Sequence, residues 1–161
     1  MFESNMITVV IDPEVDNKAV VSKAIAVALV SRAKLEFVYS EYVHYLEDGY
    51  FYDPVVAKTL REEHSEVNAR KAEELAQLAR DAGLSVNVVA LWGSPAHRSI
   101  IERIIARQPS LVIKSTSHHN RITRIFLANE DWELVRHCPV PLLLTKGLPW
   151  SEPPSFIAAV D

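Results

Sequence analysis

Residues 111–132 read LVIKSTSHHNRITRIFLANEDW, and this stretch decides how the chain folds. It begins with an apolar run at 111–113, continues through a polar and basic segment, and ends in a short amphipathic pattern that includes Trp132. The succession predicts a buried strand, a loop and a short helix. In an open α/β sheet, ligands bind at the carboxyl end of such a strand, so the loop at 114–120 is the first candidate for a site.

Four other segments have the same strand pattern. They lie at 6–11, 34–39, 84–92 and 140–145. Each is rich in apolar, often β-branched residues, which is typical of strands buried on both faces of a parallel sheet.

Helical spacing marks the segments between these strands. A helix rich in small residues is predicted at 17–32, and a long one runs from Pro54 to Ala82, where Gly83 supplies a stop. Ser94 is expected to cap a third helix that has Pro95 at its first position. The predicted inward residues are Leu60, His64, Val67, Lys71, Leu75, Leu78 and Ala82 in the long helix, and His97, Ile101, Ile104 and Ile105 in the third.

Strands alternating with helices predict one parallel sheet with helices on both faces. The expected strand order is 3-2-1-4-5, with the switch point between the first and fourth strands. Asp12 ends the first strand, and residues 114–120 leave the fourth. We therefore expect them to face each other across one crevice.

Composition limits the classes of protein. The chain has 161 residues, 48% hydrophobic and 24% charged, with a net charge of −4, so it has no basic surplus for nucleic acid. No apolar run reaches membrane-spanning length, and the first residues do not form a signal peptide. Cys138 is the only cysteine, which excludes an intramolecular disulfide. These features favour the cytoplasm.

The last residues repeat the pattern of the first strand. After a proline-rich stretch at 148–154, residues 156–161 read FIAAVD, and residues 7–12 read ITVVID. Asp161 stands 149 positions after Asp12, about one domain length. We expect one α/β domain at 1–147, followed at 148–161 by a linker and the start of a second repeat. The alternative is a disordered apolar tail.

Several motifs resemble one known family. The motifs are VVID at 9–12, GSP at 93–95, LVI at 111–113 and, most specific, RHCPVPLLL at 136–144. Residues 6–146 resemble a universal stress protein domain of the UspA type. Lys114 and the segments at 120–121, 125–126, 131–132 and 148–150 are similar to the tandem-domain, E-type branch. The resemblance implies a Rossmann-like, adenine-nucleotide-alpha-hydrolase-like fold and a role in the stress response.

The resemblance also implies a nucleotide site. Nucleotide-binding members hold ATP with an acid after the first strand and a spaced glycine pattern after the fourth. Here the three glycine positions fall on Lys114, Ser117 and Ala128, so only Asp12 matches. The candidate cofactor-binding residues are Asp12, Pro13, Lys114, Ser115, Thr116, Ser117, His118 and Asn129.

The loop chemistry argues against ATP as the ligand. Glycines in phosphate loops permit positive φ and a close approach of backbone N–H groups, yet residues 114–128 contain none. Glu130, Asp131 and Glu133 occupy the start of the next helix, where acids interact with the helix dipole and repel phosphate. We expect the nearby basic residues to pair internally with Glu130 and Asp131, and Lys114 is a candidate to pair with Asp12. No cofactor is expected, and ATP is the disfavoured alternative.

Other polar groupings give weaker signals. Ser115–Ser117 beside His118 and His119 lack the base and orienting group that a nucleophile needs, so no catalytic residue is predicted. His97 with these two histidines has no metal-binding spacing, so no metal site is predicted. Trp132 and Cys138 are expected to be core residues. The aromatic segment at 42–52 has three interpretations: a lid, an irregular loop on the sheet edge, or part of a pocket for an apolar ligand.

The fifth strand is expected to mediate pairing between domains. It would form an apolar sheet edge, and such an edge needs a partner. The resemblance implies pairing with the same strand of a second universal-stress-type domain, either a tandem repeat or a second copy in a homodimer. The predicted dimerisation residues are Val140, Leu142, Leu143 and Leu144.

Together these features predict a non-enzymatic cytoplasmic stress-response domain with a degenerate nucleotide pocket and a pairing role. The alternative is an ATP-binding domain with slow hydrolysis or nucleotide-dependent signalling. No nucleic acid or membrane partner is expected.

Overall fold

The computed structural model describes residues 5–12, 15–41, 54–93, 95–116, 129–147 and 150. The elements in these ranges are β1 (Met6–Ile11), α1 (Lys18–Ser31), β2 (Lys34–Ser40), α3 (Pro54–Asp81), β3 (Val86–Leu91), α4 (Ala96–Arg107), β4 (Leu111–Ser115), α5 (Asn129–His137) and β5 (Leu142–Thr145). The predicted alternation of strands and helices is confirmed.

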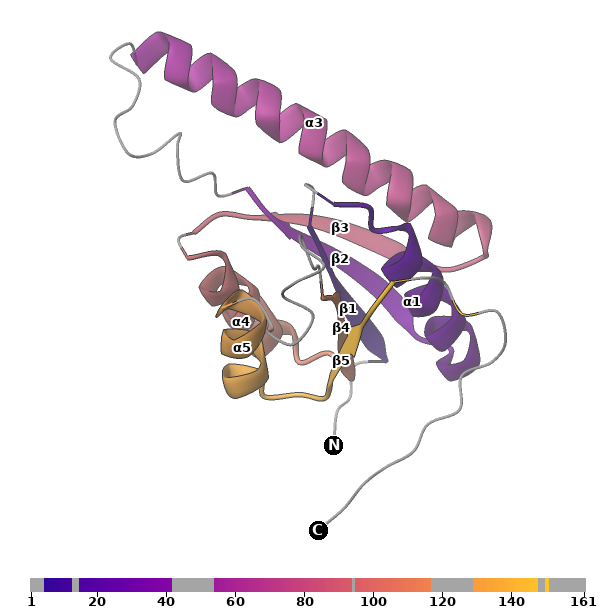
Figure 1. Ribbon diagram of the computed structural model, residues 1–161. Coiled ribbons are helices and arrows are strands. Elements are labelled where there is room, and N and C mark those ends of the chain that lie inside the picture. The colour runs from indigo at the N-terminus through magenta and orange to yellow at the C-terminus, as the bar shows by residue number, and fades with distance from the viewer. Residues whose placement is uncertain are drawn as a thin grey trace.

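The strands form one parallel sheet in the order β3-β2-β1-β4-β5, as predicted. Helices α1 and α3 cover one face, and α4 and α5 cover the other (Figure 1). The chain leaves β1 toward β2 on one side, and it later returns to β4 on the other side. The switch point therefore lies between β1 and β4, where a ligand crevice is expected in folds of this kind.

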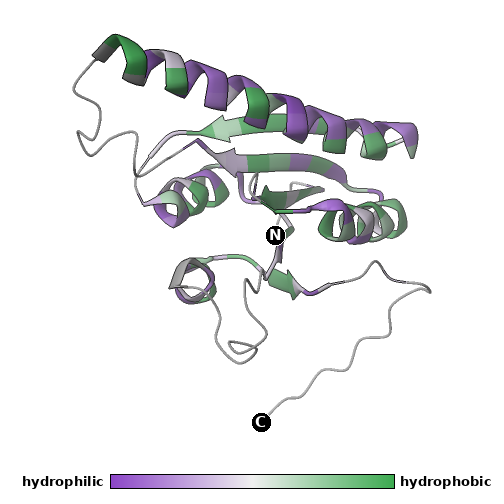
Figure 2. Ribbon diagram, turned by 45° about the horizontal axis from the view of Figure 1, so that its top comes forward, coloured by the Kyte–Doolittle hydropathy of each residue, from purple (hydrophilic) through white to green (hydrophobic). Residues whose placement is uncertain are grey.

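Each face of the sheet has its own hydrophobic core. Ile7, Val9 and Ile11 of β1 join the core under α1 and α3, whereas Val10 joins the core under α4 and α5. This alternation follows from the two-residue period of a strand. Figure 2 shows that hydrophobic residues dominate the strands, while α3 alternates between hydrophilic and hydrophobic along its length.

The predicted stripe of α3 holds only in part: Leu60 and His64 are half-buried, as expected for His64, but the fully buried side is shifted by about one position. Its buried residues are Asn68, Ala72, Ala76 and Ala79, while Val67 and Leu78 are exposed. Small side chains let the helix backbone lie close to the sheet, and this close packing decides which side turns inward. Leu75 is half-buried and packs against the same core.

Two predictions for the opposite face are also wrong. Ile105 is 55% exposed, because α4 turns Ser99, Ile100 and Ile104 inward. Trp132 is 45% exposed and is not a core residue, since α5 buries Leu134. Helix α4 starts at Ala96 with Pro95 as its N-cap, one residue later than predicted.

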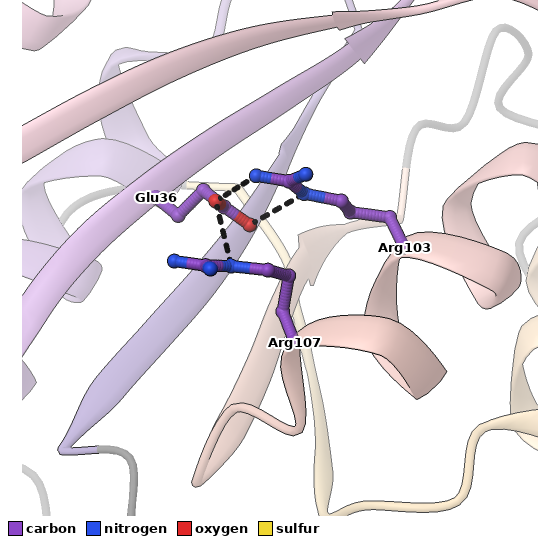
Figure 3. Close-up of polar contacts among 3 residues, drawn as sticks. All are labelled: Glu36, Arg103 and Arg107. Atoms are coloured by element: carbon purple, nitrogen blue, oxygen red, sulfur yellow. Dashed lines mark hydrogen bonds and ion pairs between the residues drawn. The ribbon is translucent and has the colours of Figure 1, made fainter.

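A buried carboxylate joins α4 to the sheet. Glu36 on β2 is completely buried, and Arg103 donates to it with Nε at 3.2 Å and Nη2 at 2.5 Å (Figure 3). Arg107 Nε lies 3.6 Å from the same carboxylate. Two arginines thus compensate the charge that the strand buries.

Among the described residues, no helix is both long and apolar enough to cross a bilayer.

Candidate functional site

The candidate crevice lies where β1 and β4 end side by side. Val10 pairs with Lys114 in the parallel register, so Asp12 follows β1 close to the end of β4. The sequence predicts Asp12 and Lys114 at the same crevice, and the strand register brings the ends of β1 and β4 together as expected.

Asn17 closes the turn between β1 and α1. Its Oδ1 accepts from the amide of Asp12 at 3.2 Å, and its Nδ2 donates to the carbonyls of Asp12 at 2.6 Å and Val15 at 2.8 Å. The Asn17 side chain is buried, so these bonds satisfy a carboxamide that would otherwise be costly to bury. Asn17 was missed as a structural residue of the site. Its position at the start of the helix predicted at 17–32, where a short polar residue is favoured, was the available signal.

Lys114 is held by an ion pair. Its side chain is buried, and its Nζ donates to Asp131 Oδ1 at 2.6 Å. Asp131 lies in the first turn of α5 and is also buried. The prediction of internal pairing with the acids at the helix start is therefore confirmed for Lys114. The alternative, Lys114 paired with Asp12, was wrong.

Two more candidate residues connect β4 to β5. Ser115 is half-buried and pairs with Thr145 in the sheet register. Thr116 is buried, and both its amide, at 2.8 Å, and its hydroxyl, at 3.2 Å, donate to the Thr145 carbonyl. The Thr116 hydroxyl hydrogen is thus used within the protein and is not directed to a ligand.

The remaining nucleotide-site candidates fall outside the described residues. Pro13, Ser117 and His118 are in this group, as is the side chain of Asn129. The same holds for His119, Ser94, the aromatic segment at 42–52 and the repeat pattern at 156–161. The site that the structure describes therefore consists of Asp12, Lys114, Ser115 and Thr116, together with Asp131.

In the part of the chain that the structure describes, no group of three or more His, Cys, Asp or Glu residues is placed to hold a metal ion. Cys138 is half-buried, and this burial raises the pKa of its thiol. Its Sγ donates to the Val140 carbonyl at 3.3 Å. A thiol with a raised pKa is a poor nucleophile at neutral pH.

The predicted pairing residues lie at the edge of the sheet. β5 is the last strand, next to β4. Leu142, Leu143 and Leu144 are half-buried, whereas Val140 is buried in the core under α4 and α5. Val140 therefore contributes to the interior of its own domain, and the leucines are the residues available at the edge.

Comparison with known proteins identifies the family. The model of the universal stress protein family matches residues 4–146. Universal stress protein E from Escherichia coli (strain K12) is 26% identical over 153 residues, and that from Photorhabdus laumondii is 23% identical over the same length. Each alignment covers 95% of this chain but 48% and 49% of the relative, so the chain spans about half the length of the curated relatives it matches.

Solved structures show the same fold. A putative universal stress protein from Pseudomonas aeruginosa UCBPP-PA14 is 26% identical with a TM-score of 0.64, covering 89% of this chain and 44% of its own. The UspA protein of Lactobacillus plantarum has a TM-score of 0.69 at 16% identity, with coverage of 86% and 95%. A universal stress protein from Archaeoglobus fulgidus, solved in complex with dAMP, has a TM-score of 0.63 at 13% identity, with coverage of 89% and 98%. The match of the family model over nearly the whole chain, together with this shared sheet, shows that the chain belongs to the universal stress protein family.

Proposed function

We propose that this chain is a non-enzymatic, cytoplasmic stress-response domain with a degenerate nucleotide crevice, and that it pairs with a second domain of the same kind. The observation that carries the proposal is the buried ion pair between Lys114 and Asp131. Lys114 stands where the family pattern has the first glycine of its phosphate loop.

The ion pair opposes phosphate binding for two reasons. A paired lysine presents little net positive charge to an incoming anion. Turning Lys114 toward a phosphate would also leave Asp131 buried without its partner, and such a loss costs about 3–5 kcal/mol. An unpaired carboxylate at the start of α5 would in addition repel the phosphate.

The second candidate function is nucleotide binding with slow hydrolysis or nucleotide-dependent signalling. It is favoured by Asp12, which keeps the family position after β1, and by the solved relative that holds dAMP. The two functions differ in one measurable property, which is the affinity of the chain for ATP.

Isothermal titration calorimetry with ATP separates the two functions. The proposal predicts no saturable binding in the micromolar range for the wild-type chain, and no nucleotide retained through purification, as read from the absorbance ratio. Lys114→Met and the exposed control Lys34→Met are titrated in parallel. Micromolar binding by the wild type refutes the degenerate crevice. If Lys114→Met abolishes that binding and Lys34→Met preserves it, Lys114 is a phosphate ligand and the second function is correct.

A phosphate-release assay tests the non-enzymatic part. The chain is expected to release inorganic phosphate from ATP no faster than buffer does. Release that scales with protein concentration and is lost in Asp12→Ala would contradict this part of the proposal.

Pairing through β5 is supported by the position and composition of the strand. An edge strand exposes unpaired N–H and C=O groups, and three consecutive leucines make this one apolar. The curated relatives are about twice as long as this chain, which leaves room in them for a second such domain. By itself, this chain is expected to form a homodimer through the same edge.

Light scattering coupled to size-exclusion chromatography tests the pairing. Leu144→Glu places a charge at the β5 edge and is expected to give a monomer. The control Ala90→Glu changes an exposed residue on β3, the opposite edge of the sheet, and should leave the dimer intact. A wild-type monomer at high protein concentration would rule out β5 pairing for this chain.

A further inference from the structure

A second cleft lies on the sheet face that α1 and α3 cover. It has a volume of about 270 Å³, and its lining comes from the end of β1, the segment leading into α1 and the middle of α3. Neither Lys114 nor Asp131 belongs to its described lining, although Ile11 and Asn17 place one end of the cleft beside the turn that holds Asp12. Most of its wall is apolar, formed by Ile11, Val15, Ala72, Leu75 and Leu78.

Asn68 is the unusual residue of this cleft. It is only 3% exposed, and it occupies a buried stripe of α3 whose other members are alanines. Among the described residues, its carboxamide has no hydrogen-bond partner. In the described part of the chain, Thr8 Oγ1 is the one side-chain polar atom that is both fully buried and without a partner, so the Asn68 amide keeps contact with the cleft.

The contrast with Asn17 sharpens this point. Asn17 also lines the cleft and is also buried, yet its carboxamide makes three hydrogen bonds to the backbone. The Asn17 side chain closes the turn between β1 and α1, whereas the Asn68 side chain makes no such hydrogen bond in the described part of the molecule. The free donor and acceptor of Asn68 are therefore available to a molecule in the cleft.

The charged residues in the described lining of the cleft balance one another. Lys18 and Lys71 supply two positive charges, and Asp16 and Glu74 supply two negative charges. A cleft with this balance gives no net preference to an anion or a cation. Its volume lies just below the usual range of about 300–1,000 Å³ for small-molecule pockets, which favours a fragment-sized ligand.

We propose that this cleft is a binding site for a small neutral molecule that has an apolar body and one amide-like group able to both donate to and accept from Asn68. The apolar wall would bury the body, and Asn68 would select the polar end. The proposal is independent of the proposed function, because no residue of the Lys114–Asp131 pair takes part.

Benzamide is a suitable probe, since it has an aromatic body and a single carboxamide. It is titrated into the full ¹⁵N-labelled chain, and backbone amide shifts are followed by NMR. Saturable shifts are expected for residues 15–18 and 68–78. Asn68→Leu keeps the size of the side chain but removes both hydrogen-bonding groups, and it should weaken binding about 5- to 30-fold, the effect of losing one to two neutral hydrogen bonds. The control Asn87→Leu changes an exposed asparagine on β3 and should leave the affinity unchanged.

Other outcomes overturn the proposal. Unchanged affinity in Asn68→Leu, shifts confined to other parts of the chain, or no saturation in the millimolar range would each do so. Benzoate that binds more tightly than benzamide would show that the lysines, and not Asn68, select the ligand. If Asn68→Leu fails to fold, Leu78→Trp provides the second test. Leu78 is partly exposed at the cleft, so a tryptophan there should obstruct it and abolish binding, and wild-type affinity in that variant also refutes the site.

Discussion

Replacing Arg103 by methionine should destabilise the fold more than replacing its buried partner Glu36 by glutamine. Arg103→Met leaves a carboxylate at 0% exposure with Arg107 as its remaining described partner, at 3.6 Å. Glu36→Gln instead leaves two arginines whose side chains are 27% and 49% exposed and can turn toward water. The asymmetry arises because only one member of the cluster is cut off from solvent.

The magnitudes follow from this geometry. Removing one partner of a fully buried ion pair costs about 3–5 kcal/mol, and the residual contact with Arg107 lowers our expectation for Arg103→Met to about 2–3 kcal/mol. For Glu36→Gln we expect about 1–1.5 kcal/mol, since the glutamine still accepts a hydrogen bond. The control is Arg98→Met on the same helix. Arg98 pairs with Glu102 at 3.1 Å, but both side chains are well exposed, so its loss should cost at most about 0.5 kcal/mol.

Urea unfolding followed by far-UV circular dichroism measures these differences. In thermal unfolding, Arg103→Met should lower Tm by about 4–12 °C, because 1 kcal/mol corresponds to about 2–4 °C in a chain of this size. If Arg103→Met and Arg98→Met have equal stabilities, the buried cluster does not hold α4 to the sheet. A larger loss for Glu36→Gln than for Arg103→Met would refute the argument from solvent access.

Three further predictions concern groups whose environment the fold changes. Burial, and to a lesser degree the charge and hydrogen bond of Glu41, raises the pKa of Tyr39 to about 12. The folded chain therefore holds the phenol proton of Tyr39 more tightly than the unfolded chain does. As the pH rises from 10 to 12, the free energy of unfolding of the wild type should fall relative to that of Tyr39→Phe, by about 2–3 kcal/mol in total. Urea unfolding of both proteins across this pH range measures the difference. The raised pKa of the Cys138 thiol predicts slow alkylation by iodoacetamide at pH 8 in the folded chain and faster alkylation in urea, and equal rates would contradict the burial argument. The buried ammonium of Lys23 donates to the Lys146 carbonyl at 2.6 Å and lies 5.6 Å from the ring centroid of Trp150. Lys23→Met should therefore shift the ¹⁹F NMR signal of a fluorinated Trp150. An unchanged signal would rule out the contact.

The strand order was predictable from the sequence because it depends on local patterns and general rules. Continuous apolar runs such as residues 6–11 mark strands that are buried on both faces, and alternation with helices requires right-handed crossovers. The position of the crevice follows from the strand order alone. Lys114 and Asp12 could therefore be assigned to it without coordinates.

The orientation of the helices was less predictable. In α3, large apolar residues such as Val67 and Leu78 compete with alanines for the inward side, and the sequence pattern favours the large ones. Close packing against the sheet selects Ala72, Ala76 and Ala79 instead. A hydrophobic period shows that a helix is amphipathic, but it does not measure the distance between the helix and the sheet.

The sequence by itself determined the family, the strand order, the crevice at the end of β4 and the presence of acids where a phosphate would approach. Only the tertiary structure decided which carboxylate Lys114 meets, that Glu36 is enclosed by two arginines, and that Asn68 lines a cleft with no partner among the residues that the structure describes. The physical reason is the range of the interactions. Strand and helix patterns arise within a few neighbouring residues, whereas Lys114 and Asp131 are 17 positions apart and Glu36 and Arg103 are 67 apart. Such partners are chosen by the packing of whole elements, and the local sequence does not encode that packing.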